Sequence, residues 1–249
     1  GFEGSLRPYQ QRDVGWLAFL GRLGLGACLA DDMGLGKTTQ LIATVLADPA
    51  PGPTLVIAPV SVLGNWQREI ERFAPGLSVL VHHGGARHDH DTDFAGRAAA
   101  ADVVLTTYSL IARDADHLGA VSWGRLALDE AQYIKNPRTQ AAKATAALAA
   151  SRRIALTGTP VENRLAELWS LMNVLNPGLL GTITGFTKRF AGPIERDGDE
   201  ETTALLRRIT GPFVLRRLKS DRSIIDDLPD KIEQTELCTL TDEQATLYQ

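Results

Sequence analysis

Short apolar runs and longer amphipathic segments alternate along most of the chain. The runs lie at residues 27–30, 54–58, 77–81, 102–106, 125–128 and 153–156. The run at 54–58 is continuous and apolar, which is typical of a strand buried on both faces of a sheet, and the runs that begin at residues 102, 125 and 153 repeat the pattern after a charged first residue. Because helix-like segments separate most of the runs, the pattern predicts βαβ units and a mainly parallel sheet.

The segments between the runs have apolar residues at helical spacing. We expect helices at residues 8–23, 38–47, 62–73, 94–100, 109–118, 139–150 and 165–175. Ser61 is a candidate cap for the helix that begins at residue 62. From 182 to 210 the chain is helical and more polar, and residues 232–240 look like another strand. The predicted fold class is therefore α/β, with helices flanking a mainly parallel sheet.

A glycine-rich turn ending in Gly36-Lys37-Thr38 joins the first run to the helix after it. Strand, glycine-rich turn and helix form the setting in which backbone N–H groups cradle phosphates, next to the positive end of the helix. In this signature Lys37 would reach the β- and γ-phosphates and Thr38 would hold Mg²⁺. The general motif has glycine five residues before Gly36, where this chain has Asp31. The alternative is a turn that only caps a helix, and the strand–turn–helix context favours phosphate binding.

Asp129 and Glu130 directly follow the apolar run at 125–128. At the end of a strand, Asp129 could hold Mg²⁺ and Glu130 could accept a proton from an attacking water. An acidic pair is a weak signal alone and could be a charged surface. Paired with Gly36-Lys37-Thr38 it becomes strong, because the two motifs do complementary work on one Mg²⁺–nucleotide.

A third polar loop, Thr157-Gly158-Thr159-Pro160, follows the last run. Parallel sheets bind ligands at the carboxyl ends of their strands, so we expect the three loops to converge on one crevice. An ordinary turn is the alternative for this loop.

Composition narrows the class of protein. The chain has 249 residues, 44% of them hydrophobic, a net charge of −4 and two cysteines. Overall charge does not mark a nucleic-acid binder, so any basic face must be local. No apolar run approaches the ~18 residues of a membrane span. Two cysteines give no disulfide framework, which favours a reducing, intracellular setting. The chain lacks an initial Met and stops within a helix-like pattern, so we expect a fragment of a longer protein.

Together the motifs resemble the Swi/Snf-type ATPases of helicase superfamily two, the motors of chromatin remodelling and their bacterial relatives. The resemblance covers nearly the whole chain, and Asp31 fits the family form of the phosphate loop. The segments that carry the resemblance are Leu6-Arg7-Pro8-Tyr9-Gln10, Asp31 to Thr38, Val56-Ile57-Ala58-Pro59, Leu105-Thr106-Thr107-Tyr108, Asp129-Glu130-Ala131-Gln132, Leu156 to Pro160 and Phe213-Val214-Leu215-Arg216-Arg217. The last of these is typical of this family rather than of helicases at large.

The resemblance implies a particular domain organisation. Residues 1–222 would form the first RecA-like lobe of a P-loop ATPase, with a helical protrusion at about 176–211, and residues 223–249 would be a linker and the start of a second lobe. The second lobe, whose arginine completes the ATP site, has no counterpart in the chain. We therefore expect the isolated fragment to be nearly inactive.

The resemblance also implies a function, with ATP and Mg²⁺ as cofactors. The protein would be a DNA-dependent ATP hydrolase that moves along double-stranded DNA without separating the strands, in a bacterial cytoplasm, associated with the nucleoid. An alternative is a nucleotide-gated module that remodels or recycles a protein partner, such as RNA polymerase or another DNA-bound complex. Membrane association is not expected.

Matching the family motifs residue by residue gives the candidate site. The catalytic candidates are Lys37, Asp129, Glu130 and Gln132. Thr38 and Asp129 would hold Mg²⁺. The nucleotide would contact Gln10 through adenine, and Asp32, Met33, Gly34, Leu35, Gly36, Lys37, Thr38 and Thr39 through the loop. The DNA candidates are Pro59, Asn65, Thr106, Thr107, Tyr108, Thr157 and Thr159. Gln132, Thr157 and Thr159 would couple the nucleotide state to DNA.

Three further features leave alternatives open. A stretch with four histidines (His82, His83, His88 and His90) and three aspartates (Asp89, Asp91 and Asp93) could bind a metal, but the family has a comparable segment without one. The basic residues Arg207, Arg208, Arg216, Arg217, Lys219 and Arg222 could contact DNA phosphates, brace the lobes or form a solvated face. Trp66 and Trp169 could stack on a ligand, although their amphipathic helices favour core packing.

Overall fold

The computed structural model describes residues 1–84, 93–158 and 164–219, and a seven-stranded sheet is its centre. The strands are β1 (Ala27–Leu29), β2 (Thr54–Ala58), β3 (Val79–Val81), β4 (Val103–Thr107), β5 (Trp123–Leu128), β6 (Ala150–Leu156) and β7 (Val214–Leu215). Their order is β3-β4-β2-β5-β6-β1-β7, and all the pairings in the described chain are parallel. The predicted parallel sheet is confirmed.

Residue contacts divide the chain into Gly1–Arg217 and Leu218–Gln249. The fold described here is that of the first unit. The predicted boundary at residues 222 and 223 and the predicted strand at 232–240 lie outside the described residues, so both stay predictions.

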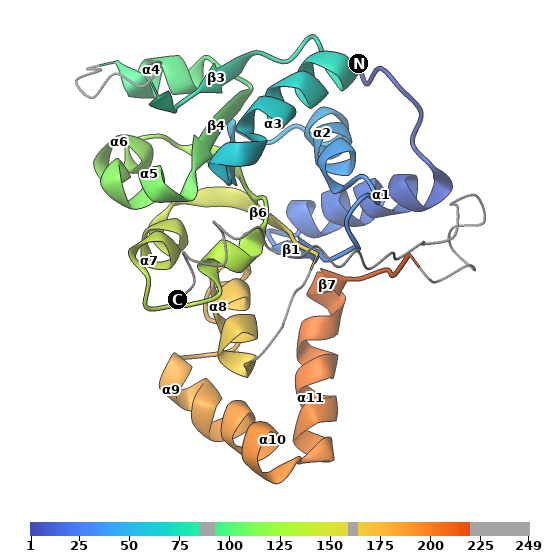
Figure 1. The fold of residues 1–249 in the computed structure, drawn as a ribbon, viewed down its shortest axis with the longest axis vertical. Coiled ribbons are helices and arrows are strands. Elements are labelled where there is room, and N and C mark those ends of the chain that lie inside the picture. The colour runs from blue at the N-terminus through green and yellow to red at the C-terminus, as the bar shows by residue number, and fades with distance from the viewer. Residues whose placement is uncertain (85–92, 159–163, 220–249) are drawn as a thin grey trace, which may run out of the picture. The chain divides into compact units, whose positions relative to one another are not determined.

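Helices cover both faces of the sheet (Figure 1). One face carries α1 (Pro8–Arg22), α2 (Lys37–Ala47) and α3 (Val60–Phe73). The other face carries α4 (Phe94–Ala99), α5 (Tyr108–Arg113), α6 (Ala115–Gly119), α7 (Gln140–Ala147) and α8 (Leu165–Leu175). This is a three-layer α/β arrangement, as the alternating pattern predicts.

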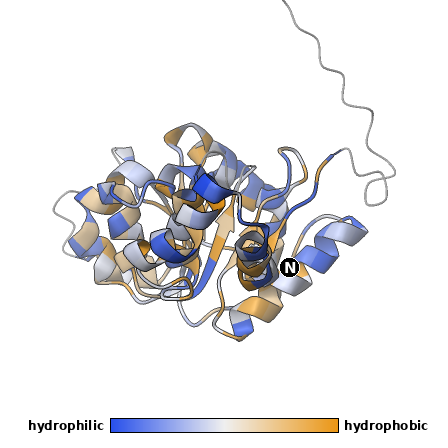
Figure 2. Ribbon diagram, turned by 90° about the horizontal axis from the view of Figure 1, so that it is seen from below, coloured by the Kyte–Doolittle hydropathy of each residue, from blue (hydrophilic) through white to orange (hydrophobic). Residues whose placement is uncertain are grey.

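Two apolar cores result, because successive side chains of a strand point to opposite faces. Along β2, Leu55 and Ile57 enter the core beneath α5 to α8, whereas Val56 and Ala58 enter the core beneath α1 to α3. Every residue of β2, β4 and β5 is buried, which explains why these strands are mainly apolar rather than alternating. Figure 2 shows the apolar strands inside and the hydrophilic residues on the outer sides of the helices.

A helical excursion follows α8. It consists of α9 (Ile183–Phe186), a π-helical turn at Thr187–Ala191, α10 (Gly192–Asp197) and α11 (Glu200–Thr210), which leads back to β7 (Figure 1). Asp199 caps α11 by accepting a hydrogen bond from the backbone N–H of Thr202 at 2.9 Å. Phe186, Phe190 and Leu206 join the core beneath α8. The excursion occupies the position at which the resemblance predicts a protrusion.

The amino ends of the strands are held together by arginines and one asparagine. Asp48, which follows α2, accepts from Arg22 at 3.1 Å and from Arg152, and its carbonyl accepts from Arg125 at 2.7 Å. Arg125 is 1% exposed, and burial lowers its pKa to about 10, with the nearby Arg152 acting in the same direction.

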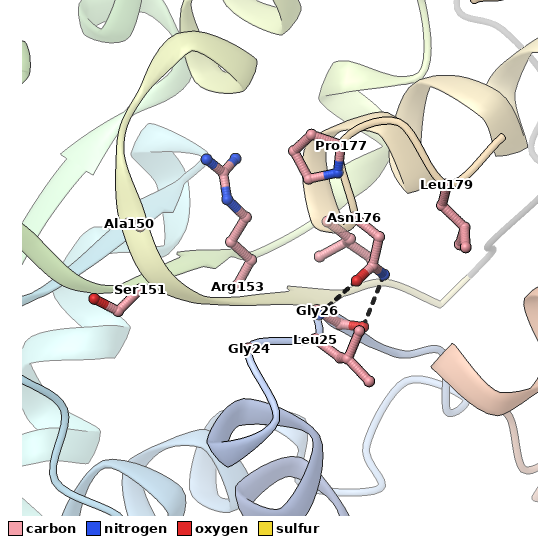
Figure 3. A pocket seen from close by; sticks show the side chains of 10 residues that line it. Gly24, Leu25, Gly26, Ala150, Ser151, Arg153, Asn176, Pro177 and Leu179 are labelled. Atoms are coloured by element: carbon pink, nitrogen blue, oxygen red, sulfur yellow. Dashed lines mark hydrogen bonds between the residues drawn. The ribbon is translucent and has the colours of Figure 1, made fainter. Parts of the chain in front are cut away.

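A cavity of about 410 Å³ lies at the same edge, between the start of β6 and the end of α8 (Figure 3). Asn176 bonds both backbone groups of Gly26, accepting at 2.8 Å and donating at 3.0 Å. A Cβ on Gly26 would lie 2.4 Å from the carbonyl oxygen of Leu175, so this close approach requires glycine. Arg153 donates to the carbonyls of Leu148 and Val174. Through these contacts, side chains connect the loops at the amino ends of the strands.

Several predicted boundaries are wrong. Helix α3 begins at Val60 after Pro59, so Ser61 is not its cap. The helix predicted at 109–118 is interrupted at Asp114, whose carboxylate pairs with His82 at 2.8 Å. The alanine-rich helix predicted at 139–150 ends at Ala147, and β6 already begins at Ala150. Within the described residues, none of the helices combines the length and the hydropathy that crossing a bilayer requires.

Candidate nucleotide site at the carboxyl ends of the strands

The three candidate loops follow neighbouring strands. β1 pairs with β6, and β6 pairs with β5, with Leu29 opposite Leu156 and Leu128 opposite Ala155. The loops that begin at Ala30, Asp129 and Thr157 therefore leave the same edge of the sheet. A Cβ on Gly158 would lie 3.6 Å from the Met33 side chain, so the third loop also approaches the glycine-rich turn. The expected convergence of the loops is confirmed.

The glycine-rich turn has a backbone that needs its glycines. Gly34 and Gly36 have φ of 83° and 78°, in the left-handed region that glycine tolerates best. A Cβ on Gly36 would also lie 2.4 Å from Nε2 of Gln10. The turn delivers the chain directly into α2, so the N–H groups of the first turn of α2 lie beside the loop.

Leu35 anchors the middle of this turn. Its side chain is 1% exposed, and its carbonyl oxygen accepts three side-chain hydrogen bonds. Tyr9 Oη donates at 3.0 Å, Gln10 Nε2 at 3.2 Å and Gln40 Nε2 at 3.1 Å. Gln10 also accepts from the backbone N–H of Arg7 at 2.9 Å. Gln10 thus lies against the loop, and its contact with adenine stays a prediction.

Lys37 folds back over the loop that precedes it. Its Nζ donates to the carbonyls of Asp31 at 2.5 Å and Asp32 at 3.2 Å. Burial lowers the pKa of Lys37, and the carboxylates of Glu130 and Asp31 act in the opposite direction. Lys37 is half-buried within this acidic setting.

The other loop candidates differ in exposure. Met33 is 71% exposed and Gly34 is exposed, whereas Asp32, Thr38 and Thr39 are half-buried. Thr38 and Thr39 lie in the first turn of α2, where a hydroxyl can face a bound phosphate or its metal.

Asp129 is held in place from two sides. Its Oδ2 accepts from Trp66 Nε1 at 2.8 Å, and its Oδ1 accepts from the backbone N–H of Glu130 at 3.0 Å. Burial raises the pKa of Asp129, and the Trp66 hydrogen bond opposes this. Each oxygen keeps a lone pair for a further ligand, and carboxylate and hydroxyl oxygens suit Mg²⁺. Asp129 and Thr38 therefore fit the expected cation.

Trp66 is 2% exposed, so core packing, not ligand stacking, describes it. Sequence reasoning missed its hydrogen bond to Asp129, which joins residues 63 positions apart. Trp169, half-buried on α8, donates to the carbonyl of Gly181 at 3.0 Å.

Glu130 has a strained backbone and a polar chain leading from it. Among the described residues other than glycine, it alone has a positive φ, 50°. Its Oε2 accepts from Gln132 Nε2 at 2.8 Å, and Gln132 Oε1 accepts from Thr157 Oγ1 at 3.2 Å. This chain connects the acidic loop after β5 to the loop after β6.

Side chains at the end of β4 and the start of α5 form hydrogen bonds within the protein, and one of them reaches the acidic loop. Tyr108 Oη donates to the carbonyl of Asp129 at 2.8 Å, and its ring stacks on Tyr133 at 5.1 Å. Thr106 donates to the carbonyl of His82 at 3.1 Å, and the hydroxyl of Thr107 lies 3.0 Å from that of Ser109. Thr106, Thr107 and Tyr108 are at most 5% exposed. Their side chains in this arrangement contact protein, not solvent.

The remaining candidates are distributed as follows. Pro59 is half-buried, Asn65 is exposed, and Thr157 is buried. Thr159 lies outside the described residues, as do His88, His90, Asp89, Asp91 and Arg222. Within the ranges that the structure describes, no group of three potential metal ligands is found.

The basic residues between positions 207 and 222 differ in their environments. Arg207, Arg208, Arg216 and Lys219 are exposed. Arg217 is instead bonded to Asp13 and Asp31. Arg217 therefore connects elements within the first unit, which is not the predicted bracing of two lobes, and DNA contact stays open for the exposed members.

Comparisons with known proteins agree with this geometry. The family model described as SNF2-related domain matches residues 9–249. The chain is 51% identical, over its whole length, to the putative ATP-dependent helicase/translocase YwqA of Bacillus subtilis. It is 37% identical over 98% of its length to the TATA-binding protein-associated factor MOT1 of Saccharomyces cerevisiae, and 38% identical over its whole length to the human chromatin-remodeling ATPase INO80.

Among solved structures, the chain is similar to the Sulfolobus solfataricus SWI2/SNF2 ATPase core in complex with double-stranded DNA. The TM-score is 0.84, with 47% identity over 99% of this chain. The chain spans 27% of the YwqA relative, 14% of MOT1 and 52% of the solved ATPase core.

Proposed function

Because the chain belongs to the family of SNF2-related domains, we propose that it is the ATP-binding lobe of a motor that moves along double-stranded DNA without separating the strands. Membership of this family implies ATP hydrolysis. The observation that best supports the catalytic assignment is the different bonding of the adjacent carboxylates. Asp129 is fixed by Trp66 and by the backbone N–H of Glu130, whereas the carboxylate of Glu130 accepts from Gln132, which leads to the next loop.

Hydrolysis of ATP is phosphoryl transfer to water, in which the protein mainly positions groups and stabilises charge. Lys37 and the N–H groups of the loop would hold the phosphates. Thr38 and Asp129 would hold Mg²⁺, which neutralises charge on the phosphate oxygens when bound. Glu130 would orient and deprotonate the attacking water. Since Gln132 bonds both Glu130 and Thr157, a shift of either loop would reach the water-activating group.

DNA binding is proposed from the relatives. The solved neighbour is a complex with double-stranded DNA, and the Bacillus relative is described as a helicase/translocase. Pro59, Asn65, Thr157 and Thr159 remain DNA candidates through side chain or backbone. For Thr106, Thr107 and Tyr108, burial leaves the backbone as the available contact in this arrangement. Contacts of this kind would go to phosphates and be independent of sequence.

A second candidate function is remodelling of a protein partner. The similarity to a TATA-binding protein-associated factor favours a protein bound to DNA as that partner. RNA polymerase is one candidate of this class. In this version the nucleotide state would be coupled to release of the partner rather than to continued movement.

One experiment separates the two functions. ATP hydrolysis by the full-length protein is measured with and without duplex DNA, at one salt concentration, because phosphate contacts are salt-dependent. The motor proposal predicts strong stimulation by duplex DNA with no strand separation in a parallel assay. Hydrolysis that ignores DNA but responds to a protein complex would favour the second function, and no hydrolysis under any condition would contradict both.

A related proposal is that residues 1–249 supply only part of the motor. The chain spans 52% of the solved ATPase core, and an arginine supplied across a cleft is worth roughly 10³–10⁵ in rate. We expect residues 1–249 alone to bind ATP weakly and to show little DNA-stimulated hydrolysis. Rates comparable to those of the full-length protein would show that this lobe is sufficient.

A further inference from the structure

Arg217 forms a buried ion cluster beside the phosphate loop. Its Nη1 and Nη2 both donate to the carboxylate of Asp13 on α1, and Nη1 also lies 3.3 Å from Oδ2 of Asp31. The side chain of Arg217 is 11% exposed, and both aspartates are 0% exposed. A planar guanidinium that serves two carboxylates in this way fixes their relative positions.

The backbone of Arg217 is bonded to the same loop. Its N–H donates to Oδ1 of Asp31 at 2.9 Å, and its carbonyl accepts from the N–H of Asp32 at 3.1 Å. One step earlier, Ala30 N–H donates to the carbonyl of Leu215 at 2.7 Å. The pairing of β7 with β1 thus continues beyond both strands into the first residues of the loop.

The cluster also reaches the middle of the loop through Tyr9. The guanidinium carbon of Arg217 lies 5.5 Å from the centre of the Tyr9 ring, a cation–π distance. Tyr9 Oη in turn donates to the carbonyl of Leu35. Arg217 therefore contacts the start of the loop directly and its middle through one intermediate side chain.

Charge in this cluster is unbalanced. Two buried carboxylates share one guanidinium, and burial raises the pKa of Asp31 to about 6 and also raises the pKa of Asp13. Arg217 acts against both increases. The other charged or titratable groups that act on this cluster are Arg7, Arg12, Lys37 and Tyr9.

Arg217 is also the last residue of the first unit, and the chain continues from it into the second. Its bonds therefore tie the loop to the point at which the chain leaves this unit.

We propose that Arg217 is a positioning residue for the nucleotide phosphates. It holds the phosphate loop between β7 and α1, and it neutralises two buried carboxylates that would otherwise repel the phosphates. This inference rests on the proposed ATP site.

The test measures MgATP affinity of the full-length protein without DNA, at about pH 6 and about pH 8.5. The variants are Arg217→Lys, Arg217→Gln and Arg217→Gln combined with Asp31→Asn. Arg216→Gln is the matched control, because Arg216 is the neighbouring arginine and is exposed. Removing Arg217 takes away the group that opposes the rise in both pKa values, so the two carboxylates carry more negative charge at the higher pH than at the lower one, and the defect should grow with pH.

We expect Arg217→Gln to weaken binding about tenfold or more at the higher pH and less at the lower pH, with Arg217→Lys in between. Adding Asp31→Asn should recover part of the loss at the higher pH, and Arg216→Gln should match the unmodified protein. If Arg217→Gln does not fold, the double variant with one carboxylate neutralised takes its place, and it should show a loss that Arg216→Gln does not.

Unchanged affinity in folded Arg217 variants would overturn the inference. A loss that is equal at both pH values and is not relieved by Asp31→Asn would assign Arg217 to stability alone and would also overturn it. Absence of MgATP binding by the unmodified protein would instead refute the proposed function, so the two failures are distinguishable.

Discussion

Charged side chains have different bonding partners and different roles at the two ends of the sheet. At the amino ends of β5 and β6, Arg125 and Arg152 donate hydrogen bonds to Asp48, and these bonds connect the loops at this end. At the carboxyl ends, Asp129 and Glu130 are each fixed by one or two donors and keep lone pairs for further ligands. Among the described residues other than glycine, the one positive φ is that of Glu130, at the carboxyl end. The buried charges at the amino end therefore stabilise the structure, whereas the half-buried carboxylates at the carboxyl end are suited to bind a ligand.

The comparison predicts that single changes at the carboxyl end reduce hydrolysis strongly with little effect on folding. Lys37→Ala should have the largest effect, because it removes the only lysine of the phosphate loop. We expect the rate of ATP hydrolysis by the full-length protein to fall by about 10³, the upper range for one electrostatic stabiliser. The control is Lys143→Ala, an exposed lysine on α7. Near-normal turnover with an unchanged melting curve would defeat the assignment.

Glu130→Gln should have the next largest effect. It removes the proposed base and retains a side chain of similar shape beside Gln132. Turnover should slow by at least ~100-fold, the scale of general-base catalysis. Single-turnover measurements with saturating ATP isolate this step. A variant that binds ATP poorly but turns over normally would show that Asp129 and Glu130 have been given each other's roles.

Trp66→Phe tests a contact that the sequence alone did not indicate. An aromatic ring stays in the core, although it is smaller, and the hydrogen bond to Asp129 is lost. Removing a group that orients a metal ligand typically costs 10–100-fold in metal affinity. We expect about a tenfold rise in the Mg²⁺ concentration for half-maximal hydrolysis, with the rate at saturating Mg²⁺ reduced less. An unchanged Mg²⁺ requirement would separate Trp66 from the site.

The fold followed from sequence because its signals are local. Apolar runs and helical spacing located six of the seven strands and the helices around them. β7 was missed because it has two residues, and its pairing with β1 is visible only in three dimensions. The alanine-rich segment favoured a helix through residue 150, yet Arg153 bonds the carbonyl of Leu148 just before β6 begins.

The site was predictable where a motif names a residue and not where a distant residue supports it. Lys37, Asp129 and Glu130 follow from short patterns next to strands. The bond of Trp66 to Asp129 and that of Arg217 to Asp13 join residues 63 and 204 positions apart, and no local pattern encodes them. Burial of Thr106 and Tyr108 also depended on tertiary packing.

Asp48→Asn should have the smallest effect on hydrolysis and a large effect on stability. Asp48 is 4% exposed, and the change leaves Arg125 and Arg152 without their carboxylate. Breaking a buried pair costs about 3 kcal/mol of unfolding free energy, which a lowered urea midpoint would reveal. Hydrolysis below the unfolding transition should change less than about twofold. A catalytic defect as large as that of Trp66→Phe would show that the amino end also affects the reaction, which would contradict the comparison.

The central claim is that the loops at the carboxyl ends of the strands bind MgATP. In this claim Asp129 is a ligand of Mg²⁺, and Glu130 is the base that activates the attacking water. The most direct test is a calorimetric titration of ATP, with and without Mg²⁺, into the full-length protein and its Asp129→Ala and Glu130→Gln variants. The account predicts that Glu130→Gln binds MgATP like the unmodified protein and that Asp129→Ala no longer responds to Mg²⁺. Mg²⁺-dependent binding that survives Asp129→Ala, or that is lost in Glu130→Gln, would contradict it.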